Sequence, residues 1–245
     1  MELLFHRVYE MAEMMAGLVT ADCDYCFGEL DWDSPCVDRC LIAFSKTSLL
    51  GYFCFAHIAI HERRRFRKDP ELVDVETEHL AFERYSIPHK RFEEFRQNFP
   101  RVEDEQDAFY PWMLDQEEAF AQLWERMTDE VAHVLFGNRG FLLEFNLGLA
   151  EYRRRRRDRP STRCAIPQWV KKAVYFRENG KCALCKKDLS GLIALDAKQQ
   201  YDHIVPLKSL GANDPCNIQL LCRKCNLLKG ASPARTSFIY DPWWK

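Results

Sequence analysis

A short segment of this chain brings an acid, a histidine and two amides close to a pair of cysteines. It runs from Asp202-His203 through Asn217 to the end of Cys222-Arg223-Lys224-Cys225-Asn226. A histidine accepts a proton near neutral pH, which suits a general base. The side-chain oxygens of Asp202 and Asn226 are hard ligands of the kind that Mg²⁺ or a similar cation prefers. The segment therefore predicts a catalytic site in which one divalent cation lies beside a basic imidazole.

A second Cys-x-x-Cys pair, Cys182 and Cys185, lies upstream of Cys222 and Cys225. The two pairs are separated by 36 residues. Four thiolates in two such pairs fit a closed tetrahedral zinc site. The chain has 11 cysteines, an odd number, and no recognisable export signal, which favours metal binding over a disulfide framework. We expect a structural zinc that holds two short strands and one helix together where few apolar residues are present.

The elements around these residues determine what each side chain can reach. Neighbouring residues of a strand point in opposite directions, so Asp202 and His203 could address a metal ion and a water molecule from opposed sides. On a helix that starts near Cys222, positions 222, 225, 226 and 229 fall within an arc of about 100°. We therefore expect the two cysteines to face the zinc and Asn226 to face the catalytic site. Lys229 would be left free to contact phosphate.

Residues 166–232, about a quarter of the chain, resemble the zinc-bearing HNH endonuclease domain. The resemblance rests on both cysteine pairs and on Ile166-Pro167, Val170, Val174, Arg177, Gly180, Asp202-His203-Ile204-Val205-Pro206, Asn217, Leu220-Leu221, Asn226 and Lys229-Gly230. It implies a small ββα-metal, treble-clef-like fold that hydrolyses DNA phosphodiester bonds and nicks one strand per site.

The resemblance also implies a role for each residue of the catalytic set. His203 would be the base, Asp202 and Asn226 the cation ligands, and Asn217 the residue whose amide oxygen orients the imidazole. The last position of the motif is often histidine in the family and is Asn226 here. Because an amide oxygen is a harder ligand, this favours Mg²⁺ or Mn²⁺ over a softer metal.

Charge divides the chain into two parts of opposite sign. Residues 1–150 carry 15 Lys and Arg against 29 Asp and Glu, and residues 151–245 carry 20 against 8. The basic part could meet the phosphates of DNA, and RNA fits the same charge, whereas the acidic part would be repelled. We expect an acidic, mainly helical domain at 1–157, a linker at 158–165 and the HNH domain at 166–245, an α+β chain altogether.

Apolar periodicity and proline positions predict the helices of the acidic part. We expect helices at about 1–20, 57–68, 75–85, 89–98, 115–136 and 140–157, separated by Pro70, Pro88, Pro100 and Pro111. Residues 21–57 are punctuated by Cys, Gly, Asp and Pro, and we expect them to be irregular. The acidic part could dock a protein partner, form a homodimer or cover the basic face until DNA competes. An acidic helical domain without any such role is an equal alternative.

Several basic residues are candidates for contacts with nucleic acid. One set is the run from Arg153 to Arg157, which is either a phosphate-contacting arm or a solvated helix end. Its members are Arg153, Arg154, Arg155, Arg156 and Arg157. The other set comprises Lys208, Arg223, Lys224 and Lys229.

A second set of ligands for a metal precedes residue 60. Cys23, Cys26, Cys54 and His57 form a Cys-x-x-Cys and a Cys-x-x-His pair with 27 residues between them, which suits a second zinc. Cys36 or Cys40 could replace one of these ligands. Buried free cysteines are the competing interpretation.

The sequence also bears on cellular setting and on a competing function. The start Met1-Glu2-Leu3-Leu4 lacks a cationic flank, and no stretch approaches about 18 uninterrupted apolar residues. We expect a cytoplasmic protein without a membrane segment. The leading hypothesis is a regulated or partnered nuclease, with anti-phage defence or a mobile element as its setting. The alternative is a non-catalytic zinc module that binds nucleic acid.

Overall fold

The computed structural model describes residues 3–5, 7–21, 23–32, 34–98, 104–191, 198–230 and 234–239. The chain forms two compact units, each assembled from segments that are distant in the sequence. Unit 1 comprises Met1–Met15 and Phe53–Val134, and unit 2 comprises Ala16–Tyr52 and Leu135–Lys245. The expected domains at 1–157 and 166–245 and the linker at 158–165 concern which pieces fold independently, and they stay a prediction.

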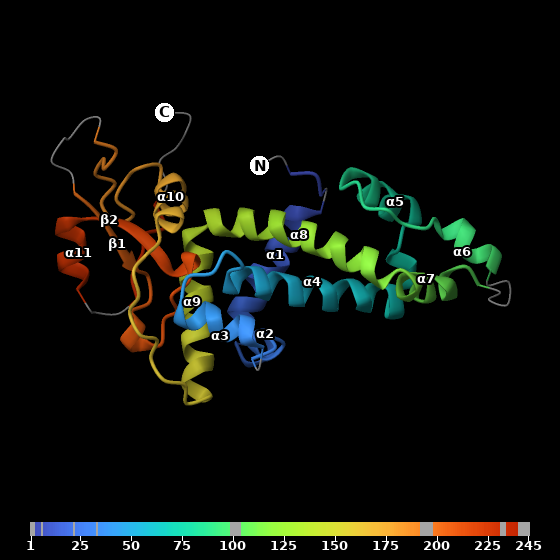
Figure 1. The fold of residues 1–245 in the computed structure, drawn as a ribbon, viewed down its shortest axis with the longest axis horizontal. Helices are drawn as coiled ribbons and strands as arrows, with labels where there is room; N and C mark the ends of the chain where they lie inside the picture. The colour runs from blue at the N-terminus through green and yellow to red at the C-terminus, as the bar shows by residue number, and fades with distance from the viewer. Residues whose placement is uncertain are drawn as a thin grey trace. The chain divides into compact units, whose positions relative to one another are not determined.

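Unit 1 is helical around an aromatic core. The ring of Phe120 contacts Phe66, Phe82 and Trp112 edge-on, with ring centroids 4.9 to 5.3 Å apart. Such pairs stabilise a core beyond the apolar area that they bury. The helices that contribute to this unit, labelled in Figure 1, are α1 (Val8–Ala21), α4 (Leu49–Lys68), α5 (Val75–Arg84), α6 (Phe92–Asn98), α7 (Phe109–Asp115) and α8 (Glu117–Gly137), with short 3-10 turns at Pro70–Leu72 and Gln106–Ala108.

A buried network of charges links α4 to α5 inside unit 1. Arg65 Nη2 donates to Glu62 Oε2 and to Glu78 Oε1, each at 2.5 Å, and all three side chains are at most 10% exposed. Burial raises the pKa of Glu62, but the hydrogen bond from His61 and the charges of Arg65 and Arg7 outweigh it and lower that pKa to about 2. Burial raises the pKa of Glu78, the second carboxyl group that accepts a hydrogen bond from the Arg65 guanidinium.

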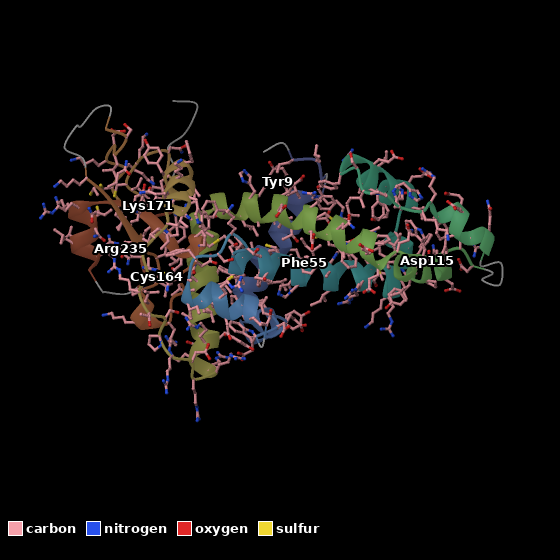
Figure 2. All side chains as sticks on the ribbon, in the orientation of Figure 1. Tyr9, Phe55, Asp115, Cys164, Lys171 and Arg235 are labelled. Atoms are coloured by element: carbon pink, nitrogen blue, oxygen red, sulfur yellow. The ribbon has the colours of Figure 1, made fainter. Side chains whose placement is uncertain are left out.

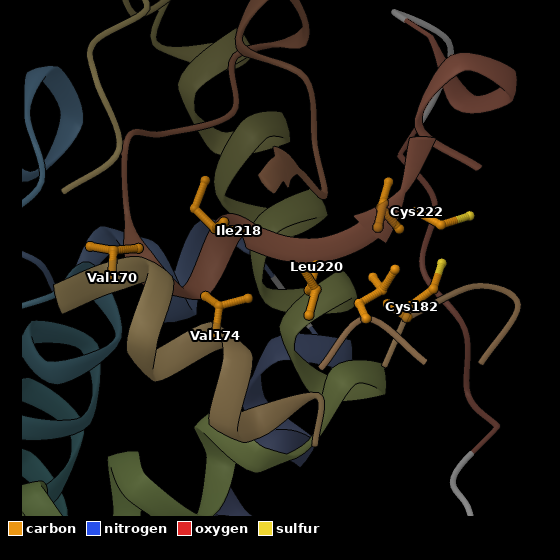
Figure 3. Close-up of a cluster of buried hydrophobic side chains, with 9 residues drawn as sticks. Val170, Val174, Cys182, Ile218, Leu220 and Cys222 are labelled. Atoms are coloured by element: carbon orange, nitrogen blue, oxygen red, sulfur yellow. The ribbon is translucent and has the colours of Figure 1, made fainter. Parts of the chain in front are cut away.

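Unit 2 contains a two-stranded antiparallel sheet that packs on helices. The register pairs Gln199 with Cys222 and His203 with Ile218. Figure 3 shows Val170 and Val174 facing β2, where they meet Ile218 and Leu220 in a buried apolar cluster. The elements of this unit are α2 (Cys23–Gly28), α3 (Pro35–Ile42), α9 (Arg139–Arg155), α10 (Gln168–Arg177), β1 (Gln199–His203), β2 (Ile218–Cys222) and α11 (Arg223–Lys229), with 3-10 turns at Leu207–Ser209 and Pro215–Asn217.

Two polar contacts outside the strands brace unit 2. Arg139 at the start of α9 forms a buried ion pair with Glu178 at the end of α10, with 2.7 Å between Nη1 and Oε2. The backbone carbonyl of Arg235, a residue labelled in Figure 2, accepts a hydrogen bond from the buried Gln219 side chain on β2 at 2.8 Å. The buried Arg139 guanidinium and the buried Gln219 NH₂ group thus each have a partner.

The loop between β1 and β2, residues 204–217, is held by residues far away in the sequence. Asp214 Oδ2 accepts a hydrogen bond from the backbone N–H of Leu49, the first residue of α4, at 2.7 Å. Asn146 Nδ2 donates to the carbonyl of Cys216 at 3.1 Å. Arg153 Nη1 donates to the carbonyl of Leu210 at 2.7 Å. Segment 16–52 and α9 therefore fix the loop that leads away from His203.

The prediction of irregular structure for residues 21–57 is wrong, because α2, α3 and the first turns of α4 lie there. The start signals are short. Pro35 follows Ser34 at the first position of α3, where a proline is tolerated, and the Ser48 hydroxyl accepts a hydrogen bond from the Gly51 N–H at 3.1 Å at the start of α4. The cysteines and acids of this region masked the helices that these signals begin.

The predicted fold class is confirmed. The chain is mainly helical, with a small two-stranded sheet near its carboxy terminus and four cysteines that converge beside it. Within the described ranges, no helix combines the length and the apolar character needed to cross a membrane.

Candidate active site and metal centre

Two tight turns present the four cysteines of unit 2. In the first, the N–H of Lys186 donates to the carbonyl of Cys182 at 2.9 Å, and Lys186 has a φ of 61°. In the second, Cys222 ends β2 and caps α11, where its sulfur accepts a hydrogen bond from the Cys225 N–H at 3.4 Å. Both turns direct the two sulfurs of a pair to the same side, as a metal site with paired cysteines requires.

The four sulfurs converge with dimensions that suit zinc. The ligand atoms of Cys182, Cys185, Cys222 and Cys225 all lie within 4.8 Å of one another. The sulfurs of Cys185 and Cys222 are 3.7 Å apart. Tetrahedral Zn–S bonds of about 2.3 Å place neighbouring sulfurs about 3.8 Å apart, so the arrangement is consistent with a four-cysteine zinc site.

The pKa of the Cys222 thiol is lowered in this cluster, whereas burial raises the pKa of the Cys185 and Cys225 thiols. Burial also raises the pKa of the Cys222 thiol, but the hydrogen bond from the Cys225 N–H and those from neighbouring thiols outweigh it and lower the pKa overall. A thiolate is the form that binds zinc. Figure 3 shows Cys182 and Cys222 at one end of the apolar cluster, so a metal here would close that end of the core.

The second predicted zinc set is divided between the two units. Cys23 and Cys26 belong to unit 2, and Cys54 and His57 to unit 1. The Cys23 side chain lies outside the described residues, as does that of Cys36, and Cys40 Sγ donates to the carbonyl of Thr47 at 2.9 Å. Among the side chains that the structure describes, only the four cysteines of unit 2 converge as a group of three or more suitable ligands. The second zinc stays a prediction.

Three of the four predicted catalytic residues, Asp202, His203 and Asn226, line one cavity of about 480 Å³. Asp202 and His203 enter it from the end of β1, and Asn226 enters it from α11. Asp202 is 21% exposed, His203 is buried and Asn226 is half-buried. A carboxylate and an amide offer oxygen atoms of the kind that Mg²⁺ or Mn²⁺ prefers, and a catalytic cation held by them stays a prediction.

The imidazole of His203 contacts an amide that the sequence did not single out. His203 Nε2 lies 3.3 Å from Asn213 Oδ1, and Asn213 is completely buried. Burial lowers the pKa of His203, more than the Asn213 hydrogen bond and the Asp202 charge raise it. The cations of Arg163 and Lys229 lower it further. The environment therefore favours the neutral imidazole, the form that can accept a proton.

The predicted contact between Asn217 and the imidazole is replaced by a different one. Asn217 Oδ1 accepts a hydrogen bond from the Val205 N–H at 2.8 Å. Its Nδ2 donates to the carbonyls of Val205 at 2.9 Å and Ala212 at 3.0 Å. Both ends of this amide are thus used to close the loop, and Asn213 takes the place beside His203. Asn217 shapes the site through the backbone.

Lys229 also differs from its prediction as a phosphate contact. Its side chain is 1% exposed, and Nζ donates to Asp202 Oδ2 at 2.8 Å and to the carbonyl of His203 at 2.7 Å. The ammonium is therefore engaged inside the protein. It fixes the Asp202 carboxylate and the end of β1 in place.

Other cations are better placed to meet a polyanion. Lys208, Arg223 and Lys224 are exposed, and Lys208 lines the cavity of Asp202 and His203. Arg163, for which the sequence predicted no role, is exposed and lines the same cavity. Its only sequence signal is its position in the basic segment that precedes α10.

The arginine run splits into one buried residue and four exposed ones. Arg153 is buried, and it donates to the carbonyls of Leu210 and Arg159 and to the Asp158 carboxylate. Its predicted role as a phosphate contact is therefore wrong. The exposed members are Arg154, which pairs with Glu151, Arg155, which pairs with Asp24 and Glu151, Arg156, whose guanidinium lies over the Trp32 ring, and Arg157.

Comparison with known proteins bears on the carboxy-terminal part of the chain. No curated protein and no solved structure matches the chain. A family model does match, over the segment that holds both cysteine pairs, Asp202, His203, Asn217 and Asn226. Its match indicates a protein that acts on nucleic acid. Residues 182–232 match the family model of the HNH endonuclease.

Proposed function

We propose that this protein is a metal-dependent endonuclease that hydrolyses DNA phosphodiester bonds, one strand per site. The observation that carries the proposal is the shared cavity of Asp202, His203 and Asn226. This cavity is lined by a buried imidazole, a carboxylate and an amide, and the cations of Lys208 and Arg163 line it as well. Hydrolysis of a phosphodiester needs a base for the attacking water, a cation for the phosphoryl charge and positive side chains that attract the nucleic-acid backbone.

Each residue has a distinct task in this proposal. His203, neutral because of its burial, takes a proton from the water that attacks phosphorus. Asp202 and Asn226 would hold Mg²⁺ or Mn²⁺, which supplies positive charge for the crowded phosphoryl oxygens. Lys229 holds the Asp202 carboxylate in position. Lys208 and Arg163 attract the backbone and orient the scissile phosphate.

The four-cysteine centre has a supporting task. Zinc held by Cys182, Cys185, Cys222 and Cys225 would join the turn that carries Cys182 and Cys185 to β2 and α11. Asn226 follows Cys225 directly, so the position of this predicted cation ligand depends on the turn formed by Cys222 and Cys225. We therefore assign the zinc to structure and the second cation to catalysis.

The direct test is nicking of supercoiled plasmid by the wild type and by His203→Ala, each with Mg²⁺, Mn²⁺ or EDTA. His133 is exposed on α8 in unit 1, so His133→Ala is the matched histidine control. We expect nicking with Mg²⁺ or Mn²⁺ that EDTA and His203→Ala abolish and that His133→Ala retains. A labelled RNA of the same sequence, run in parallel, decides between the two nucleic acids.

The competing function is a non-catalytic zinc module that binds nucleic acid. Binding through exposed cations persists in EDTA, whereas hydrolysis through Asp202 and Asn226 does not. A wild-type protein that shifts DNA in a gel but leaves every phosphodiester intact with both metals would support the binding module. It would refute the nuclease.

A further inference from the structure

A single buried amide, that of Asn213, joins His203 to two other segments of unit 2. Asn213 Oδ1 lies 3.3 Å from His203 Nε2. Asn213 Nδ2 donates to the carbonyl of Thr162 at 2.7 Å and to the carbonyl of Ile42 at 3.2 Å. The residue is 0% exposed, so solvent does not compete for any of these contacts.

The two carbonyls determine which way the Asn213 amide points. A carbonyl accepts hydrogen bonds and never donates them, so the atom that faces Ile42 and Thr162 must be the NH₂ group. The reversed amide would place three oxygens against one another in a buried site, at a cost of roughly 1–3 kcal/mol for each unpaired group. Oδ1, an acceptor only, is therefore the atom that faces His203.

An acceptor beside Nε2 determines which of the two nitrogens carries the proton in the neutral imidazole. One nitrogen of a neutral imidazole carries the proton and the other carries the lone pair. Because Asn213 Oδ1 can only accept, Nε2 must carry the proton and Nδ1 the lone pair. We propose that Asn213 is a positioning residue for catalysis, which holds His203 as the Nε2–H tautomer and presents Nδ1 as the base. The consequence for catalysis rests on the proposed nuclease function, whereas the tautomer does not.

The position of Asn213 is itself fixed from several sides. The neighbouring Asp214 accepts the Leu49 N–H at 2.7 Å and the Cys216 N–H at 2.8 Å. Arg153 holds the carbonyls of Leu210 at 2.7 Å and Gly211 at 3.3 Å. The amide therefore cannot shift without breaking contacts to α4 and α9. Through the Ile42 carbonyl, the end of α3 becomes a part of the support for the base.

Two substitutions of the same shape separate the acceptor from the rest of the amide. Asn213→Leu and Asn213→Asp both lose the donations to Ile42 and Thr162. Asp alone keeps an oxygen that can face Nε2, and its second oxygen meets the two carbonyls, so Asn213→Asp is expected to be less stable than the wild type. Asn146→Leu is the structural control, because it removes a different donor to the same loop and does not touch His203. Each variant is first compared with the wild type by circular dichroism and thermal unfolding.

The decisive readout is the tautomer of His203 in the full-length protein. The chain has 7 histidines, so imidazole-¹⁵N labelling with His203→Gln as the assignment reference isolates the signal. We expect a protonated Nε2 and an unprotonated Nδ1 in the wild type, Asn213→Asp and Asn146→Leu, and loss of that pattern in Asn213→Leu. Two results overturn the proposal: a wild type in which Nδ1 carries the proton, or an Asn213→Leu variant that keeps the proton on Nε2.

Nicking rates supply the second readout. A positioned base contributes about 10²- to 10⁴-fold. We expect Asn213→Leu to reduce the rate about 10- to 100-fold, Asn213→Asp to recover part of the loss, and Asn146→Leu to stay near the wild type. Equal rates for the two Asn213 variants would contradict the role. If Asn213→Leu does not fold, Asn213→Ser, too short to reach the ring, takes its place.

The tautomer measurement also separates this inference from the proposed function. A wild type that cuts no nucleic acid but shows the expected Nε2–H pattern refutes the nuclease and leaves the role of Asn213 toward the imidazole intact. A wild type that nicks DNA with His203 in the other tautomer refutes the positioning role alone.

Discussion

Replacing Arg153 should destabilise the protein far more than replacing the arginine next to it. Arg153 is buried, and its guanidinium donates to the carbonyls of Leu210, Gly211 and Arg159 and to the Asp158 carboxylate. Arg153→Met keeps an unbranched apolar stem of similar width and removes all of these donors. The loop that carries Asn213 loses its Arg153 contacts to α9 and keeps the contact that Asn146 makes to Cys216.

The contacts set the size of the effect. A buried acceptor left without a donor costs about 1–3 kcal/mol, and the carbonyls of Leu210 and Gly211 both lose their Arg153 donor. We therefore expect Arg153→Met to lose about 4 kcal/mol of unfolding free energy. Arg154 is exposed and pairs with the exposed Glu151, so Arg154→Met should cost at most about 0.5 kcal/mol.

Urea unfolding followed by circular dichroism measures both variants under the same conditions. Hydrogen exchange on residues 204–217 locates the change, because protection there should fall in Arg153→Met and persist in Arg154→Met. In thermal unfolding, about 4 kcal/mol corresponds to a fall of roughly 8–16 °C for a chain of this size. If both variants stay within about 0.5 kcal/mol of the wild type and lose DNA affinity equally, the clamp is refuted and Arg153 acts as a phosphate contact.

Three further predictions follow from the metal centre, the buried charges and the exposed cations. Cys185→Ser should lose one zinc per chain by mass spectrometry of the dialysed protein, whereas Cys164→Ser should keep the wild-type content; equal zinc in both contradicts the site. Glu62, with a pKa of about 2 in the folded protein and about 4.3 unfolded, adds stability above pH 4.3 that is lost as pH falls toward 2. Glu62→Gln should therefore destabilise strongly at pH 7 and about half as much at pH 3, unlike the control Glu10→Gln, and a difference that is independent of pH would rule this out. Lys208→Ala should reduce the slope of log affinity against log salt by about 1, and an unchanged slope excludes a phosphate contact there.

The parts of the site that follow from local spacing could be predicted from the sequence. Cys182 and Cys185 are two residues apart, as are Cys222 and Cys225, and each pair forms one tight turn whatever surrounds it. Asn226 follows a capping cysteine, so the helix brings it to the cavity with the same certainty. Periodicity likewise located α5, α8 and α9 to within a few residues.

The contacts that cross the chain could not be predicted in this way. The partner of His203 is decided by the carbonyls of Ile42 and Thr162, which orient the Asn213 amide from segments remote in sequence. No local pattern distinguishes Asn213 from Asn217. Lys229 is similar, because only the fold reveals that its ammonium reaches the end of β1.

Arg153 is an intermediate case, because a usable signal was present. Leu142, Asn146 and Leu149 are buried on α9 at helical spacing, and position 153 continues the same row. The run of five arginines concealed it, since all of them look alike when they are judged by charge. Helical phase separates the buried member from the exposed ones.

The hydrogen bond between Leu49 and Asp214 has a consequence for the order in which the chain folds. Every segment of unit 1 has been synthesised once residue 134 is complete, whereas unit 2 needs residues up to the last strand and helix. At about 5–20 residues per second, residues 16–52 wait roughly 9–35 s until α11, the last element that completes their unit, has been synthesised. The entropic cost of closing a loop grows only slowly with its length, so this long loop costs little more to close than a shorter one. The delay is therefore set by translation. Nascent chains therefore expose α3 and the start of α4 during this interval, which makes that segment the expected site for chaperone binding.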